Sequence, residues 1–330
     1  MNGCKVLIAA ELATKSLLQH EFQQLTFIPL KGYRIRYSRK KSLLPFVIMA
    51  QIPRLLFNIY KEHYWLKKIV KNFGVDAILS DNRFGLSHSR IPSIYITHQL
   101  LIKTGTRLTE KIAQIIHYWF IKKYTICWIP DFEGSQNIAG ALSHPAALPS
   151  NAKYIGCLSR FVKKEHKIKY NLLILVSGPE PQRSIFESLL LSQLQTYTGD
   201  VLLVRGLPGD ASGIAVPNAN KGIVIKNHLD AGQLNDAMEQ AELVISRSGY
   251  TTVMDLIKLR QKAILVPTPG QTEQEYLANH LMQQQIFYTE PQEGFVITGA
   301  MKKAATFPFK VQSMDMEQYK PIVSQFVESL

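Results

Sequence analysis

Ten residues, SRSGYTTVMD from Ser246 to Asp255, combine hydroxyl groups, a glycine and a carboxylate at helical spacing. They follow a short apolar segment, so they predict a turn from a strand into a helix with Gly249 near the helix N-terminus. Backbone N–H groups and the positive end of the helix dipole hold a phosphate at such a terminus. Asp255 lies four residues after Thr251 on the same helix face, where a carboxylate can accept hydrogen bonds from a ribose diol. The segment therefore indicates a nucleotide site, and the alternative is an ordinary turn with Ser and Thr as helix caps.

The elements that must position this segment form a repeated pattern in the second half of the chain. Short apolar segments alternate there with amphipathic ones, and the predicted strands are 172–176, 201–204, 223–225, 243–245 and 263–266. Continuous apolar strands between helices indicate a parallel sheet covered on both faces. Ligands bind such sheets at the carboxyl ends of the strands. We therefore expect the polar turns after these strands to converge on one crevice.

The first half repeats the pattern more loosely. Its predicted strands are 6–9, 25–28, 75–79, 93–96 and 126–129. A chain of 330 residues is long for a single core, and two domains fit the usual size range. The fold class predicted is α/β, with two doubly wound, Rossmann-like domains at 1–158 and 159–330 that face each other across a cleft.

Composition narrows the class of protein. A hydrophobic content of 46% with 19% charged residues is typical of a folded globular chain. The three cysteines are far apart, which suits the cytoplasm and argues against a disulfide framework or a metal cluster. The N-terminus lacks the features of a secretory signal, and the longest apolar stretch, 43–52, is too short to span a bilayer.

The net charge of +13 is unevenly distributed. Residues 1–165 hold 24 Lys and Arg against 9 Asp and Glu, whereas the remaining residues are slightly acidic. Much of the excess flanks 39–73, where an apolar stripe is edged by basic side chains, among them Arg39, Lys40, Lys41, Arg54, Lys61, Lys67, Lys68 and Lys71. This pattern predicts a helix that rests on an anionic membrane surface, and the alternative is a core-facing helix with a solvated basic face. No nucleic-acid recognition pattern accompanies the charge, so we expect no nucleic acid partner.

Two stretches of the second half carry a family resemblance. The stretch VISRSGYTTVMDLIKLRQKAILVPTPGQTEQEYLANHL, residues 244–281, resembles the nucleotide-sugar signature of family 28 glycosyltransferases. LLILVSGPEPQRS, residues 172–184, stands where that family has a Gly- and Ser-rich diphosphate turn. The best-known member of the family transfers N-acetylglucosamine to a lipid-linked acceptor in peptidoglycan synthesis. The resemblance implies a GT-B fold, a nucleotide-diphosphate sugar as donor, and no metal or other cofactor.

The resemblance also implies roles for single residues. Asp255 matches the ribose-binding carboxylate, which is usually Glu in the family, and Glu275 stands where a second glutamine is common. The other donor-binding positions implied are His228 and Leu229 for the base, Ser248, Gly249 and Thr251 for the phosphates, and Gln271 and Gln274 in the loop near the sugar.

The diphosphate turn departs from the family pattern. Pro179 and Pro181 have no N–H to donate, so anion binding there depends on Ser177, Gly178 and Arg183. A departing diphosphate needs positive charge, and Arg247 is a further candidate source. For the base that deprotonates the acceptor hydroxyl, the candidates are Asp81 and His98, because each follows a predicted strand of the first half. Turn formation by Asp81 and capping by His98 are the structural alternatives.

Together these residues predict a peripheral enzyme on the inner face of the cytoplasmic membrane. It would move a sugar from a nucleotide-diphosphate sugar, a UDP-sugar by the resemblance, to a lipid-linked or membrane-proximal acceptor. The alternatives are a sugar-nucleotide epimerase of the same fold and a non-catalytic sugar-nucleotide-binding protein. The sequence also opens on what resembles the family's second strand. We therefore expect a preceding strand and a Gly-rich turn, about 30 residues, to be missing.

Overall fold

The computed structural model describes residues 3–33 except 12–14, 16, 17 and 20, and then 44–104, 106–208, 222–310 and 313–330. Side chains are described from residue 51 onward in the first long helix, and the Arg107 side chain is left out. The chain forms two compact units. Unit 1 comprises Met1–Leu12, Thr26–Cys157 and Asp315–Leu330, and unit 2 comprises Ala13–Leu25 and Leu158–Met314.

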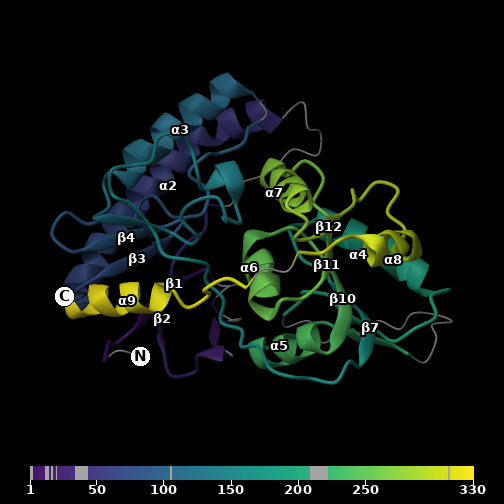
Figure 1. The fold of residues 1–330 in the computed structure, drawn as a ribbon. Helices are drawn as coiled ribbons and strands as arrows, with labels where there is room; N and C mark the ends of the chain where they lie inside the picture. Colours follow the sequence, from purple (N-terminus) through teal and green to yellow (C-terminus); the bar gives the residue numbers. More distant parts are fainter. Residues whose placement is uncertain are drawn as a thin grey trace. The chain divides into compact units, whose positions relative to one another are not determined.

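Unit 2 contains a six-stranded sheet in which every pairing is parallel. Its order is β12-β11-β10-β7-β8-β9, so the chain starts in the middle and winds outward in both directions (Figure 1). The strands are β7 (Tyr170–Leu175), β8 (Val201–Val204), β9 (Ile223–Lys226), β10 (Ala241–Ser246), β11 (Ala263–Leu265) and β12 (Tyr288–Thr289). This is the doubly wound arrangement that the alternating pattern predicts.

The helices of unit 2 lie in the connections between these strands. They are α4 (Gln182–Leu194), α5 (Ala231–Glu239), α6 (Tyr250–Leu259), α7 (Thr272–Gln283) and α8 (Ile297–Thr306). The central strands are almost wholly apolar and buried because helices cover both faces. Phe186 and Leu190 of α4 and Ala300 of α8 pack into one core cluster with strand residues such as Ile174.

Unit 1 contains a four-stranded parallel sheet of order β3-β4-β5-β6. Its strands are β3 (Ile78–Asp81), β4 (Ser93–Ile96), β5 (Ile126–Ile129) and β6 (Ala152–Tyr154). A separate two-stranded parallel sheet joins β1 (Leu7–Ala10) and β2 (Thr26–Pro29). Each strand predicted in the first half is therefore present within a few residues of its predicted bounds.

Two long helices of unit 1 run side by side (Figure 1), α2 (Leu44–Phe73) and α3 (Arg107–Ile121). The amphipathic segment predicted at 39–73 corresponds to the 30-residue α2, which continues through Pro53. Its expected basic residues Arg39, Lys40 and Lys41 lie outside the described residues. Within the described part of the chain, no helix is long and apolar enough to cross a membrane.

The last helix, α9 (Tyr319–Glu328), belongs to unit 1 although it ends the chain. Phe326 packs edge-on against Trp128 of β5, with 5.5 Å between the ring centroids. The compact units are therefore not the two continuous segments 1–158 and 159–330, because the C-terminal helix packs against residues of unit 1 that are distant in the sequence. The functional division at 158/159 remains a prediction.

Candidate nucleotide site and candidate base

The turn from β10 into α6 is formed as the sequence predicts, with Gly249 as the N-cap residue. Ser248 is fully buried, and its Oγ donates a hydrogen bond of 2.9 Å to the backbone carbonyl of Gln274. Thr251 is exposed in the first turn of the helix. Of the two hydroxyls, Ser248 therefore holds the turn to the next loop, and Thr251 faces solvent.

Gly249 has no structural reason to be glycine. Its φ of −71° and ψ of 138° are open to any residue. A Cβ built on Gly249 would have no atom of the described residues within 4 Å. No described side chain caps the helix at this position, so among these residues the positive end of α6 faces open space. A glycine at this position leaves room in front of the helix N-terminus.

Asp255 lies one turn further along α6 and is largely buried. Its Oδ1 accepts a hydrogen bond of 2.6 Å from Ser159 Oγ. Burial raises the pKa of the Asp255 carboxyl to about 6, and the Ser159 hydrogen bond and the charge of Arg160 oppose that rise. A carboxylate that is costly to ionise and has a single short contact gains from further hydrogen-bond donors, and the two hydroxyls of a ribose would supply them.

The turn after β7 is exposed and contains Gly178 with φ of +109°, a conformation that other residues rarely adopt. Helix α4 begins at Gln182 without a side-chain cap. Because β7 and β10 are neighbours in the sheet and run parallel, this turn and the Ser248–Gly249 turn lie at the same edge. The sheet winds in opposite directions from these two strands, which is where doubly wound sheets bind ligands.

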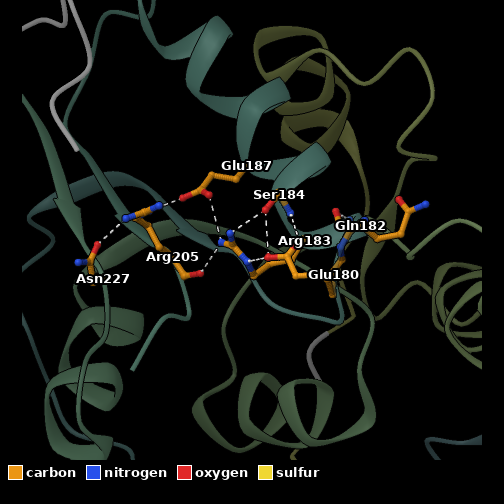
Figure 2. Close-up of polar contacts among 8 residues, drawn as sticks. Glu180, Gln182, Arg183, Ser184, Glu187, Arg205 and Asn227 are labelled. Carbon is orange, nitrogen blue, oxygen red and sulfur yellow. Dashed lines mark hydrogen bonds and ion pairs between the residues drawn. The ribbon is translucent and has the colours of Figure 1, made fainter. Parts of the chain in front are cut away.

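Arg183 lies in a network of charged side chains within the protein (Figure 2). It is 7% exposed, and its Nε donates to Glu180 Oε1 at 2.7 Å. Its Nη1 donates to Glu187 Oε2 at 3.1 Å and to the carbonyl of Arg205 at 3.2 Å. Glu187 also pairs with the Arg205 side chain, which donates to Asn227. Carboxylates therefore neutralise the Arg183 guanidinium, so it does not lie at an open anion site as the sequence reasoning expected.

Arg247 is 1% exposed and has a different environment. Its guanidinium lies 4.0 Å from the centroid of the Phe186 ring. It donates to the carbonyls of Val266 and Gln182, both at 3.1 Å. Burial lowers the pKa of Arg247 to about 10. Direct contact with a ligand was expected, but the side chain instead fastens the end of β10 to its neighbours, and its charge reaches the turn only through the electrostatic field.

The loop after β11 is held by residues of α7. Gln274 Oε1 accepts from the Thr268 backbone N–H at 2.9 Å, and Glu275 Oε1 accepts from the Gly270 N–H at 3.0 Å. Gln271 precedes the first residue of α7 as its N-cap residue. Because β11 neighbours β10, this loop lies at the same sheet edge as Gly249. The turn with His228 and Leu229 follows β9 at the far end of that edge, and His228 is exposed.

The two candidate bases come together in unit 1. Asp81 ends β3 and His98 follows the neighbouring parallel strand β4. Asp81 is exposed, yet nearby protein atoms displace enough water to raise the pKa of its carboxyl, and the charge of His98 opposes this rise. The next residue, Asn82, has φ of +52° and accepts a hydrogen bond of 2.8 Å from the Tyr95 hydroxyl. The turn that carries Asp81 is thereby fixed.

Comparisons with known proteins fit this geometry. Residues 222–293 match the model of the glycosyltransferase family 28 C-terminal domain. Over 283 residues the chain is 24% identical to the UDP-N-acetylglucosamine–N-acetylmuramyl-(pentapeptide) pyrophosphoryl-undecaprenol N-acetylglucosamine transferase of Buchnera aphidicola, covering 83% of this chain and 71% of that protein. The chain therefore resembles family 28 glycosyltransferases, over 222–293 by the family model and over most of its length by this relative.

Solved structures show that the fold is shared. The glycotransferase of kitacinnamycin is 12% identical with a TM-score of 0.60, covering 99% of this chain and 91% of that one. MurG from Acinetobacter baumannii is 14% identical with a TM-score of 0.55, covering 99% and 92%. A Streptomyces glycosyltransferase, SsfS6, complexed with thymidine diphosphate, is 12% identical with a TM-score of 0.56, covering 98% and 91%. The fold is the two-domain GT-B fold that the resemblance implied.

The family 28 domain match spans the turns after β9, β10 and β11. It therefore includes ten of the expected donor-binding residues, from His228 to Glu275, whereas Ser177, Gly178 and Arg183 lie outside it. In the described residues of this glycosyltransferase, no three or more His, Cys, Asp and Glu side chains are placed to hold a metal ion. Independence from metal remains a prediction that activity measurements must test.

Sequence reasoning missed Ser159, which contacts Asp255, and Thr268, whose buried Oγ1 has no hydrogen-bond partner among the described residues. Neither has a motif around it. Ser159 reaches Asp255 across 96 positions of sequence, so only the fold brings the two together.

Proposed function

We propose that this glycosyltransferase moves N-acetylglucosamine from its UDP derivative to a lipid-linked diphosphate acceptor. The observation that carries the donor assignment is the α6 N-terminus, where Gly249 leaves open space in front of an uncapped helix and Asp255 lies one turn behind. The diphosphate would lie at Gly249, and the ribose hydroxyls would donate to Asp255. The relative from Buchnera is named for this donor and acceptor, and SsfS6 was solved with a nucleoside diphosphate.

In the reaction, the acceptor hydroxyl attacks the anomeric carbon of the sugar, the bond from that carbon to the diphosphate oxygen breaks, and the hydroxyl loses its proton. Asp81 and His98 are the groups that would take this proton, because they lie together at the carboxyl edge of the unit 1 sheet. The N-terminus of α6 would stabilise the charge on the departing diphosphate, and the buried cation of Arg247 would add to the field.

The acceptor would reach unit 1 at a membrane. Helices α2 and α3 expose large apolar side chains together with lysines, and those with the greatest exposure are Phe57, Tyr60, Tyr64, Leu108, Ile112, Ile115 and Trp119. Apolar groups ringed by lysine favour an anionic bilayer surface. We infer peripheral attachment to the inner face of the cytoplasmic membrane, where nucleotide-sugars are available to the enzyme.

Product analysis tests this function. The chain is incubated with radiolabelled UDP-N-acetylglucosamine and an acceptor that carries a sugar on a prenyl diphosphate. Transfer predicts label in the lipid fraction and release of UDP. An inverted sugar on intact nucleotide would instead indicate an epimerase, for which the comparisons give no support, and unchanged donor would indicate a binding protein. Either outcome contradicts the proposal.

A further inference from the structure

A hollow lies between the two long helices of unit 1. It has a volume of about 340 Å³. Leu56, Ile59 and Tyr60 of α2 form one wall, Trp119 and Phe120 of α3 form the other, and Phe84 lies on the loop after β3. Phe84 stacks on Phe120 with 4.8 Å between the ring centroids. The walls are mainly apolar, with His63, Ser87 and Lys123 as the polar side chains, so the hollow favours an apolar occupant over water.

A single lysine marks one side of the hollow. Lys123 is exposed, and its Nζ lies 3.4 Å from the centroid of the Trp119 ring and 5.2 Å from that of Phe120. Burial against these rings lowers the pKa of its ammonium. The ammonium lies beside aromatic rings, and none of the ion pairs between described residues includes Lys123. An occupant that is apolar along its length and anionic at one end would satisfy both parts of the site.

The size of the hollow limits the length of chain that fits. A cavity of about 150 Å³ holds benzene, which has six carbon atoms. By that measure, 340 Å³ holds about a dozen carbon atoms, or between two and three five-carbon prenyl units. A whole long-chain lipid would not fit, but the first units after its headgroup would.

We propose that this hollow binds the first prenyl units of the acceptor lipid, with Lys123 paired to the diphosphate that joins the lipid to its sugar. The inference rests on the proposed function and locates the acceptor within unit 1. Phe84 follows the candidate base Asp81 by three residues, on the same loop. A lipid held against Phe84 would therefore present its headgroup near the end of β3, where the acceptor hydroxyl must lose its proton.

Two features favour the acceptor over an acyl chain of the bilayer as the occupant: the positive charge of Lys123 and the position of the hollow next to the loop that follows Asp81. Leu108, Ile112 and Ile115 lie elsewhere on α3 and are more than two-fifths exposed, so an exposed apolar surface is available to the membrane without the hollow. The lining of the hollow includes the lysine Lys123 and Phe84 of the loop that follows Asp81.

Calorimetric titration with prenyl diphosphates of increasing length tests the proposal without membranes. We expect affinity to rise at least about tenfold from the one-unit to the two-unit diphosphate and to level off beyond three units, because each buried methylene adds to binding only while it lies in the hollow. Leu56→Trp, which fills the hollow from a half-exposed position, should abolish this gain. Equal affinity for all chain lengths, or an unchanged gain in Leu56→Trp, would overturn the proposal.

Matched variants separate the parts of the site. Lys123→Met should weaken the two-unit diphosphate at least about tenfold and leave the uncharged alcohol unaffected, whereas Lys122→Met, its exposed neighbour outside the hollow, should change neither. Ile112→Ala should weaken binding to phosphatidylglycerol vesicles but not to prenyl diphosphates. If Leu56→Trp lowers only vesicle binding, the hollow holds a bilayer chain and the proposal is wrong. Prenyl binding without sugar transfer would leave this site intact and refute the proposed function instead.

Discussion

Replacing Asp255 by asparagine should make the protein more stable and worse at binding nucleotide. The carboxyl is buried, and its pKa rises from 3.8 to about 6. Because the folded-state pKa is above the unfolded one, ionisation at high pH costs folding free energy. Two pKa units correspond to about 3 kcal/mol, an upper bound for this group. Asparagine keeps an oxygen that can accept from Ser159 Oγ and does not ionise.

The sign of the effect depends on pH. Below about pH 3 the carboxyl is mostly protonated in both states, so the wild type and Asp255→Asn should unfold at similar denaturant concentrations. Between about pH 3 and 6 the carboxyl ionises more readily in the unfolded state than in the folded one, so the wild type loses stability as the pH rises. Above about pH 6 the variant should be more stable by a constant amount of up to about 3 kcal/mol. Urea unfolding at about pH 3 and about pH 8 measures this difference.

Nucleotide affinity should change in the opposite direction. A hydrogen bond to a charged group contributes about 1.5–3 kcal/mol, so UDP should bind Asp255→Asn about ten- to a hundredfold more weakly at pH 8. Wild-type affinity should fall about tenfold from pH 7.5 to pH 5, since only about a tenth of the carboxyl with a pKa of about 6 is then ionised. The variant controls for titration of the UDP phosphate itself, whose pKa is also near 6. A variant that binds UDP like the wild type, or is less stable at pH 8, refutes the reasoning.

Three further substitutions test the site by stability and binding. Gly249→Ala should leave thermal unfolding within a few degrees of the wild type, because a Cβ there meets nothing, but should weaken UDP at least about tenfold by titration; unchanged affinity would remove Gly249 from the site. Thr268→Val should be neutral or stabilising by about 1 kcal/mol in urea unfolding, because the Thr268 Oγ1 that it removes is buried without a hydrogen-bond partner among the described residues. Thr289→Val is the control and should destabilise, because it removes the hydrogen bond from Thr289 Oγ1 to the carbonyl of Ala278. Glu187→Gln should cost about 3–5 kcal/mol of unfolding free energy, because Arg183 and Arg205 both lose a charged partner in a buried network, and a near-neutral result would show that water reaches it.

Sequence reasoning predicted the parts of the fold that depend on local pattern. Strands such as β8 are continuous apolar segments, so the sequence alone predicted a parallel sheet. Polar turns follow these strands, so the sequence also predicted the sheet edge at which the turns lie. The Gly249 turn and the helix after it were predicted for the same reason, since hydroxyl residues and glycine favour a helix start.

Sequence reasoning failed where a side chain contacts residues that are distant in the sequence. Arg183 and Arg247 were predicted to contact the ligand, because a positive charge near a diphosphate turn suggests an anion site. The spacing of Arg183 and Glu187 already allowed a pair on one helix turn, but Arg205 completes the network from another strand. Arg247 is buried on Phe186, which no local pattern links to it. The hollow between α2 and α3 likewise depends on two helices separated by most of unit 1.

The central claim is that a nucleotide diphosphate binds at the N-terminus of α6. Amide hydrogen exchange with and without saturating UDP tests it most directly, because the backbone N–H groups of the first helical turn would become hydrogen-bond donors to phosphate. We expect UDP to slow exchange in peptides that cover 246–256, with a smaller effect at 177–184 and none in α8. Unchanged exchange at 246–256, with calorimetry showing that UDP is bound, would contradict the claim.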